Sequence, residues 1–276
     1  MKFIRNLLAR TTNSKGVTFL EIMVALGITS FVTAAIFRLY VTQHQNYLVQ
    51  DDITEVQQNA RASIDQLGRT IRMAGYGTPV GLDPLQPFNT NSDTIILAYR
   101  EDGCQTNVAV SLANGTSPLV CGSAVDCFNA GQWVYIYHPD SGGSEWFQIS
   151  SVDPATNTIF HVSDPLSTAF AQDAIIVTMK EVKFYVDTMT TPSNPTLMVQ
   201  NRGQAPIIFA DNIVDLQFRY KMKNGMTLDE PLLVEDVREV LITITGRSKN
   251  PNVEDTNNPY KFRTFNTTVG LRNLVL

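Results

Sequence analysis

The sequence contains few charged residues, few histidines and few cysteines. Charged residues make up 17% of the 276 residues and apolar residues 43%. Because a disordered chain has the opposite balance, this composition predicts a chain that folds around an apolar core. The formal net charge of −5 argues against the basic surface typical of nucleic-acid-binding proteins, so we predict no nucleic-acid partner.

Motifs for catalysis and cofactor binding are also absent from the sequence. The three histidines, His44, His138 and His161, are widely spaced, and no HExxH, GxSxG, P-loop or paired CxxC motif occurs. Residues 140–145 could hold calcium through oxygen ligands, although they lack the spacing of an EF-hand and also fit a plain turn. We therefore expect no enzyme and no cofactor.

Proline is missing from a long N-terminal stretch that begins with an apolar run. Residues 17–37 read VTFLEIMVALGITSFVTAAIF and contain a single charged side chain, Glu21. At ~1.5 Å rise per residue these 21 positions span ~31 Å as a helix, which matches the hydrocarbon core of a bilayer. The run predicts a transmembrane helix over residues 17–37.

The residues before this run are basic and contain no acid. The basic side chains are Lys2, Arg5, Arg10 and Lys15. The positive-inside rule places residues 1–16 in the cytoplasm and the chain after Arg38 outside. An ordinary signal peptide fits poorly, because its apolar region is shorter and its cleavage site follows that region. Here the expected cleavage site, Lys15-Gly16, precedes the apolar run, so cleavage there would remove the basic leader and leave the helix on the mature chain.

Glu21 is unusual because a carboxylate within an apolar helix costs several kcal/mol unless something offsets it. One interpretation is that Glu21 has a function in the membrane. The other is that it lies near enough to the membrane edge to reach lipid headgroups, since it is only ~6 Å into the run by helical rise.

The order Lys15-Gly16, then Val17-Thr18-Phe19-Leu20-Glu21, then an unbroken apolar helix resembles the class III signal of type IV prepilins and pseudopilins. The resemblance implies that prepilin peptidase cuts after Gly16 and that Val17 becomes the N-methylated N-terminus. It also implies that Glu21, at the fifth mature position, neutralises the terminal amine of a neighbouring subunit during assembly. Two opposite charges inside an apolar filament are tolerable as a pair.

Two positions depart from the pattern of the family. The mature chain begins with Val17 where the family usually has Phe. Arg38 occupies the place where major pilins have a helix-bending proline. The second departure favours a minor subunit over a bulk subunit of the filament.

Helical periodicity continues beyond the apolar run. An apolar stripe recurs every three or four residues through Val49, Ile53, Val56, Ala60, Ile64, Leu67 and Ile71. Gly75 is a suitable C′ residue and is soon followed by Pro79. We predict one helix, with residues 38–75 as its amphipathic continuation.

Residues 76–276 predict an extracytoplasmic, β-rich domain. Strand-like segments separated by Gly, Pro, Asn or Asp clusters lie at 94–99, 132–137, 146–152, 158–162, 174–186, 196–200, 213–223, 238–246 and 260–271. The expected fold class is α+β, with the long helix packed on an antiparallel sheet-rich domain, as in pilins.

Four segments of the body extend the resemblance. Residues 70–77 resemble the helix end of PilW-type minor pilins. Residues 213–220 and 237–246 resemble paired strands that PilW shares with the J pseudopilins of type II secretion, and 265–274 resembles the closing strand.

The resemblance implies a minor pilin that initiates or caps a type IV pilus. Its partners would be other pilins, prepilin peptidase and the inner-membrane assembly platform. It would first span the inner membrane once, with a cytoplasmic leader, and then reach the pilus at the cell surface. The alternatives are a minor pseudopilin of a type II secretion system and a signal-anchored extracytoplasmic binding protein or enzyme.

The three cysteines, Cys104, Cys121 and Cys127, lie close together in the sequence. In an oxidising compartment two of them are expected to pair and one to remain free. Cys121–Cys127 gives the shortest loop, with Cys104 as an alternative partner, but spacing does not fix the connectivity. A zinc site built on the three thiols is a further alternative.

Overall fold

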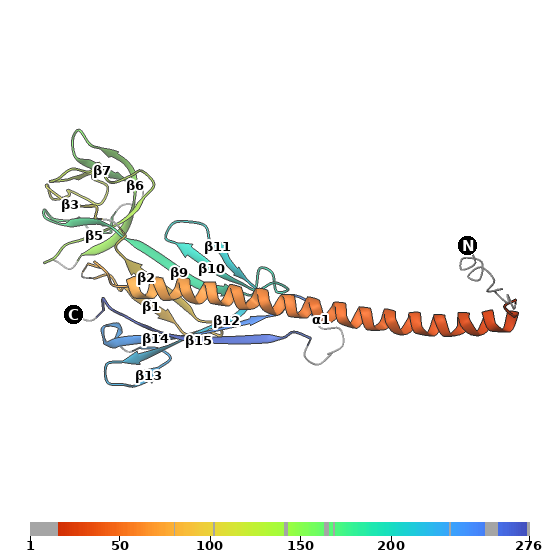
Figure 1. Cartoon of the computed structure of the whole chain (residues 1–276). Helices are drawn as coiled ribbons and strands as arrows, with labels where there is room; N and C mark the ends of the chain where they lie inside the picture. Colours follow the sequence, from red (N-terminus) through yellow and green to blue (C-terminus); the bar gives the residue numbers. More distant parts are fainter. Residues whose placement is uncertain are drawn as a thin grey trace, which may run out of the picture. The chain divides into compact units, whose positions relative to one another are not determined.

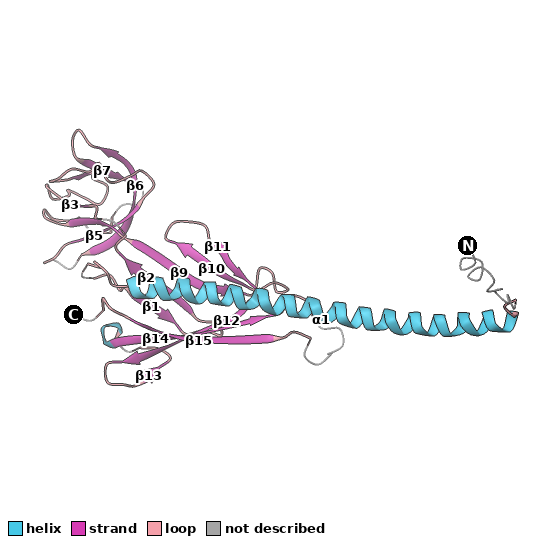
Figure 2. Cartoon of the chain, viewed as in Figure 1, coloured by secondary structure: helices cyan, strands magenta, loops and turns pink. Residues whose placement is uncertain are grey.

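The structure, a computed structural model, describes residues 16–79, 81–101, 103–140, 143–162, 166–167, 169–231, 233–251 and 259–274. Residues 1–15 of the expected leader therefore lie outside the described residues. The chain divides into two compact units, Met1–Asp51 and Asp52–Leu276. The described part of the first unit holds the beginning of one long helix, and the second unit holds the rest of that helix and the strands (Figures 1 and 2).

The predicted helix is confirmed as α1, Phe19–Met73, which has 55 residues. No proline interrupts it, so its backbone hydrogen bonds continue over its whole length. Gly75 follows its end with φ 83°, the left-handed conformation expected at C′. The N–H of Gly75 donates to the carbonyl of Ala98 at 3.0 Å, which ties the helix end to the body.

The predicted apolar stripe is buried from Val56 onward. Val56, Ala60, Leu67 and Ile71 are all nearly inaccessible to solvent, and Ile64 is partly buried against the same cluster. This half of the helix is therefore a core element of the second unit, as its 3.6-residue periodicity predicts.

Three antiparallel sheets make up the remainder of the described second unit. The five-stranded sheet has the order β1 (Leu85–Phe88), β2 (Thr94–Tyr99), β9 (Lys180–Asp187), β10 (Thr196–Asn201), β11 (Ile207–Asp211). The four-stranded sheet has the order β13 (Thr227–Leu228), β12 (Ile213–Met222), β14 (Val237–Arg247), β15 (Phe262–Gly270). The six-stranded sheet has the order β3 (Gln105–Asn107), β8 (Ile175–Thr178), β5 (Trp133–Tyr137), β6 (Ser144–Asp153), β7 (Thr158–His161), β4 (Leu119–Val120). A short 3₁₀ helix, η1 (Val234–Asp236), precedes β14.

One predicted strand, residues 174–186, is wrong as a single element. The structure has two strands there, β8 and β9, and they belong to different sheets. Met179 separates them, and β8 pairs with β3 and β5 whereas β9 pairs with β2 and β10. A continuous run of strand-forming residues does not show where the chain changes from one sheet to another, because the strands that pair with it lie far away in the sequence.

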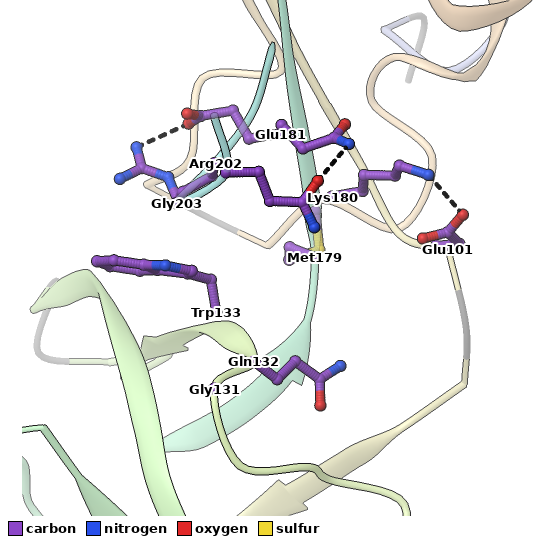
Figure 3. A pocket seen from close by; sticks show the side chains of 11 residues that line it. Glu101, Gly131, Gln132, Trp133, Met179, Lys180, Glu181, Arg202 and Gly203 are labelled. Atoms are coloured by element: carbon purple, nitrogen blue, oxygen red, sulfur yellow. Dashed lines mark hydrogen bonds and ion pairs between the residues drawn. The ribbon is translucent and has the colours of Figure 1, made fainter. Parts of the chain in front are cut away.

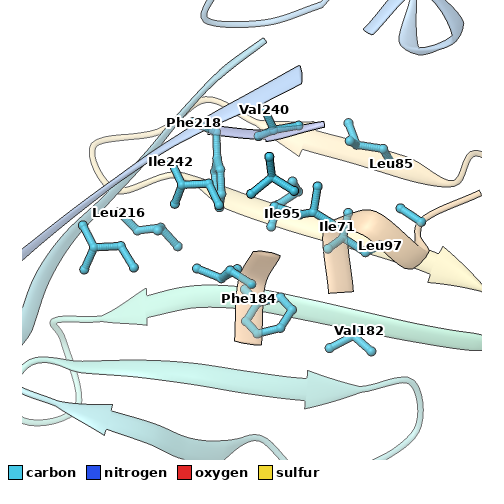
Figure 4. Packing of buried hydrophobic residues seen from close by; sticks show 14 of the residues in the cluster. Ile71, Leu85, Ile95, Leu97, Val182, Phe184, Leu216, Phe218, Val240 and Ile242 are labelled. Atoms are coloured by element: carbon cyan, nitrogen blue, oxygen red, sulfur yellow. The ribbon is translucent and has the colours of Figure 1, made fainter. Parts of the chain in front are cut away.

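Two large apolar clusters support the sheets. In the first, the buried face of α1 meets the five-stranded and four-stranded sheets, through side chains such as Ile71, Phe184 and Phe218 (Figure 4). The second lies within the six-stranded sheet and its loops. A smaller cluster that includes Ala98 of β2 and Val177 of β8 lies where the five-stranded and six-stranded sheets meet.

A buried carboxylate joins the first two sheets. Asp93 accepts the backbone N–H of Phe218 at 2.7 Å and that of Thr90 at 3.1 Å. Burial, the largest influence, raises the pKa of Asp93 above its ordinary value. The same residue's N–H donates to the carbonyl of Leu216 at 2.7 Å. Asp93 thus holds the start of β2 against β12 through hydrogen bonds to Leu216 and Phe218.

Candidate functional site

The first candidate site is the exposed beginning of α1. Every residue from Gly16 to Leu48 is exposed in the structure, including Phe19 and Phe31, each 78% accessible. An 18-residue window of this helix has a mean hydropathy of 2.0, and none of that window is buried. Because leaving one large apolar side chain in water forgoes about 1.5–3 kcal/mol, this surface requires an apolar covering.

Two hydroxyl groups in the exposed segment are satisfied by the helix itself. Thr29 Oγ1 donates to the carbonyl of Ala25 at 2.7 Å, and Ser30 Oγ donates to the carbonyl of Leu26 at 2.7 Å. Such bonds to the preceding turn let small polar side chains face hydrocarbon without an unsatisfied donor. The segment is therefore compatible with a single-pass membrane anchor. Of the described helices, this one has the length and apolar character needed to cross a bilayer.

Glu21 closes the N-terminus of α1. Its Oε2 accepts the backbone N–H of Thr18 at 3.0 Å and the Thr18 hydroxyl at 3.1 Å, while the N–H of Glu21 donates to Thr18 Oγ1 at 3.3 Å. This reciprocal arrangement is a capping box, and the negative charge also suits the positive end of the helix dipole. Sequence reasoning missed this local role, although the Thr-x-x-Glu spacing is its recognised signature.

The expected processing residues lie just before the helix. Gly16 and Val17 precede the first helical residue, Phe19, and both are exposed, with Val17 69% accessible. A Cβ added at Gly16 would meet no described atom within 4 Å. The structure thus brings Gly16, Val17 and Glu21 together at one exposed helix end, in the order that the sequence gives.

The expectation of one disulfide and one free thiol is confirmed, but the shortest loop, Cys121–Cys127, does not form, and the alternative partner pairs instead. Cys104 bonds to Cys127, with their Cα atoms 5.9 Å apart, inside the range of ~4.4–6.8 Å that disulfides require. Cys121 is free and buried. Its backbone forms an isolated antiparallel β-bridge with Val108, and its side chain lies in the apolar cluster of the six-stranded sheet. Burial raises the pKa of its thiol to about 11, so the thiol stays protonated at neutral pH.

The two metal hypotheses gain no support from the described residues. A zinc site on three thiols is excluded, since two of them form the disulfide. In the stretch proposed for calcium, positions 141 and 142 lie outside the described residues, and the Glu145 carboxylate is occupied by the N–H and hydroxyl of Ser167. Within the described part of the chain no group of three His, Cys, Asp or Glu side chains is placed to bind a metal ion.

Comparison with known proteins gives no relative for this chain. No protein-family model, no curated protein and no solved structure matches it. Its function is therefore inferred from the exposed helix, the end of that helix and the body.

Proposed function

We propose that the chain is a minor pilin, a low-copy subunit that enters a pilus-like filament through the exposed part of α1. Processing after Gly16 and methylation of Val17 precede assembly, as the resemblance of residues 15–21 to the prepilin signal implies. The observation that supports the proposal most is the exposed, predominantly apolar surface from Val17 to Phe37, in which the only charged side chain is the carboxylate of Glu21 in the first turn of the helix.

An exposed apolar helix needs a covering both before and after assembly. In a membrane, lipid chains cover the segment, and its length suits one crossing. In a filament, the equivalent helices of neighbouring subunits cover it, so that the same surface is never left in water. A structural body attached to one end of such a helix then lies outside the membrane, where a cysteine pair such as Cys104–Cys127 is stable.

Glu21 is the residue proposed to select the neighbour. Its Oε2 serves the capping box, and its Oε1 makes no hydrogen bond within the described residues. Oε1 can accept a hydrogen bond from the methylated terminal ammonium group of an adjacent subunit while Oε2 keeps its hydrogen bonds to Thr18. A carboxylate and an ammonium group removed together from water are tolerable only as a pair, so the contact disfavours misaligned neighbours.

The role of a minor subunit follows from Arg38 and from the size of the body. Arg38, in the position where major pilins bend the helix with proline, leaves α1 uninterrupted. The body adds a six-stranded sheet with its own apolar cluster to the sheets that hold the helix. A large added domain is easier to accommodate at the end of a filament than at every position along it.

The test separates the charge of Glu21 from its capping role. Glu21→Gln keeps a capping-box side chain but removes the charge, and we expect incorporation into the filament to be lost. Thr18→Val removes the cap hydroxyl and keeps the charge, and we expect incorporation to be retained. Glu55→Gln, at an exposed acid farther along α1, is the matched control. Sheared filaments and membranes are compared by immunoblot.

Two results would contradict the proposal. If Glu21→Gln enters the filament fraction as well as the unaltered chain does, the charge has no part in assembly. If mass spectrometry of the membrane-extracted protein finds an N-terminus at Met1 or beyond Ser30, in place of methylated Val17, the processing step is wrong.

A further inference from the structure

A polar pocket lies where the five-stranded and six-stranded sheets approach each other (Figure 3). Its volume is about 270 Å³. One wall is the start of β5 at Trp133, another is the turn after β10 at residues 201–204, and the floor is Met179 between β8 and β9. With Glu101, which also lines the pocket, four separate segments of the chain meet there, so the pocket exists only because the fold brings them together.

The aromatic wall of the pocket is held by an arginine. The chain has two tryptophans, and both lie against the guanidinium of Arg202, whose Cζ is 4.6 Å from the ring centroid of Trp146 and 5.7 Å from that of Trp133. Gly203 follows with φ 72°, and any Cβ there would collide with the Trp133 ring. These contacts fix the indole of Trp133, which remains partly exposed at the pocket.

The charges around the pocket cancel in pairs. Lys180 Nζ lies 2.8 Å from Glu101 Oε1, and an Arg202 nitrogen lies 2.9 Å from Glu181 Oε2. Both cations are thus already neutralised by a carboxylate of the same wall. An anionic ligand such as a phosphate would have to compete with these pairs, so the pocket favours a ligand without net charge.

The polar groups that remain offer both donors and acceptors. Gln204 Oε1 accepts from Asn201 Nδ2 at 3.0 Å, and Gln132 Oε1 accepts from the N–H of Asn129 at 3.0 Å. The amide nitrogens of Gln204 and Gln132 make no hydrogen bonds within the described residues, nor does the side-chain oxygen of Asn201. Two side-chain amide donors and one amide acceptor therefore remain available beside the indole, in addition to the second carboxylate oxygens of Glu101 and Glu181.

We infer that this pocket binds a neutral pyranose sugar unit. Each sugar hydroxyl both donates and accepts a hydrogen bond, which side-chain amides and the second oxygens of Glu101 and Glu181 can match. The C–H face of the ring packs on the indole of Trp133, an aromatic surface with a large apolar area. An apolar cavity of ~150 Å³ holds a benzene ring, so 270 Å³ suits one six-membered ring with its hydroxyls. The site is independent of the helix and of the proposed function.

The experiment uses the intrinsic fluorescence of the full-length protein, since its two tryptophans both lie at the Arg202 side chain. The protein is held in lauryldimethylamine oxide micelles, because glycoside detergents would themselves present sugar. The probes are methyl glucoside, methyl galactoside, methyl mannoside and N-acetylglucosamine. We expect at least one of them to give a saturable change, and thymidine 5′-phosphate to give none.

Variants at Gln204, which is exposed, and at Gln132, which is half-buried, test whether the response comes from this pocket. Gln204→Ala should weaken binding roughly three- to tenfold, the effect of one lost hydrogen bond, and Gln132→Ala should weaken it similarly. Gln58→Ala, at an exposed position on α1 outside the pocket, is the matched control. The inference is overturned if none of the four sugars gives a saturable change or if Gln204→Ala and Gln132→Ala both bind like Gln58→Ala. Tighter binding of the nucleotide than of any sugar also overturns it.

Discussion

The two halves of α1 share one continuous helical backbone, yet they differ both in how many apolar residues they contain and in what surrounds those residues. In residues 17–37, apolar side chains lie on every face of the helix, and all of them are exposed. From Asp52 onward they are confined to one stripe, and that stripe is buried beneath two sheets. Leu26 is 62% accessible, whereas Leu67 is fully buried.

The difference teaches that the angular distribution of apolar residues determines what a helix needs as a partner. A stripe about one face can be covered by the chain's own sheets. A helix that is apolar all round cannot be covered from one side, so its remaining faces need lipid or other helices. The exposed half is therefore the part that depends on an environment outside the chain.

The largest test of this contrast removes one leucine from each half. Leu67→Ala should lower the free energy of unfolding of the body by about 2–5 kcal/mol, because it empties a packed site in the core. Leu26→Ala should leave that free energy unchanged. Urea denaturation of the full chain in micelles, followed by tryptophan fluorescence, measures both. Equal effects of the two substitutions would show that α1 does not stabilise the body as its burial indicates.

Much of this contrast could be predicted from the sequence because it is local. The absence of proline, the spacing of Val56, Ala60 and Leu67, and the stop at Gly75 all lie within one helix, and the structure confirms them. The strands near 94–99 and 213–223 were similarly predictable from runs of strand-forming residues between turns.

What could not be predicted depends on residues that are distant in the sequence. The change of sheet at Met179 and the bond between Cys104 and Cys127 are set by which strands lie side by side, and spacing favoured other answers. The pocket at Trp133 requires Arg202 from another sheet. The capping box at Glu21 could have been predicted, because the Thr-x-x-Glu pattern of residues 18–21 is local in the sequence. Glu21 was considered only for a role in the membrane or in the filament.

Two adjacent acids at the border of the halves provide a second test, with a smaller effect. Asp52 is 7% accessible, and its Oδ2 accepts the N–H of Asn250 at 2.9 Å, whereas Asp51 is exposed. Asp52→Ala should destabilise the body by about 1–3 kcal/mol, since it removes the charged acceptor of both the backbone N–H and the side-chain amide of Asn250. Asp51→Ala should change little, by the same denaturation assay.

Hydrogen exchange at Asn250 locates the effect of this change. The amide proton of Asn250 should exchange faster in Asp52→Ala than in Asp51→Ala, because only the first substitution removes its acceptor. Unchanged exchange at Asn250 would mean that the carboxylate of Asp52 does not hold Asn250 in place. The packed half of the helix would then begin nearer to Val56.

The smallest test uses the two glycines of α1, one in each half. A Cβ at Gly68 would lie 3.5 Å from Val269 Cγ2, an ordinary contact, and a Cβ at Gly27 would meet no described atom within 4 Å. Because alanine loses less backbone entropy than glycine in a helix, Gly68→Ala should stabilise the body by about 0.5–1 kcal/mol. Gly27→Ala should not alter the unfolding of the body, measured in the same way. If Gly68→Ala destabilises the body instead, β15 lies too close to α1 to admit a methyl group at position 68. The packing of this half of the helix on its sheet would then depend on the missing side chain of Gly68 as well as on the apolar stripe.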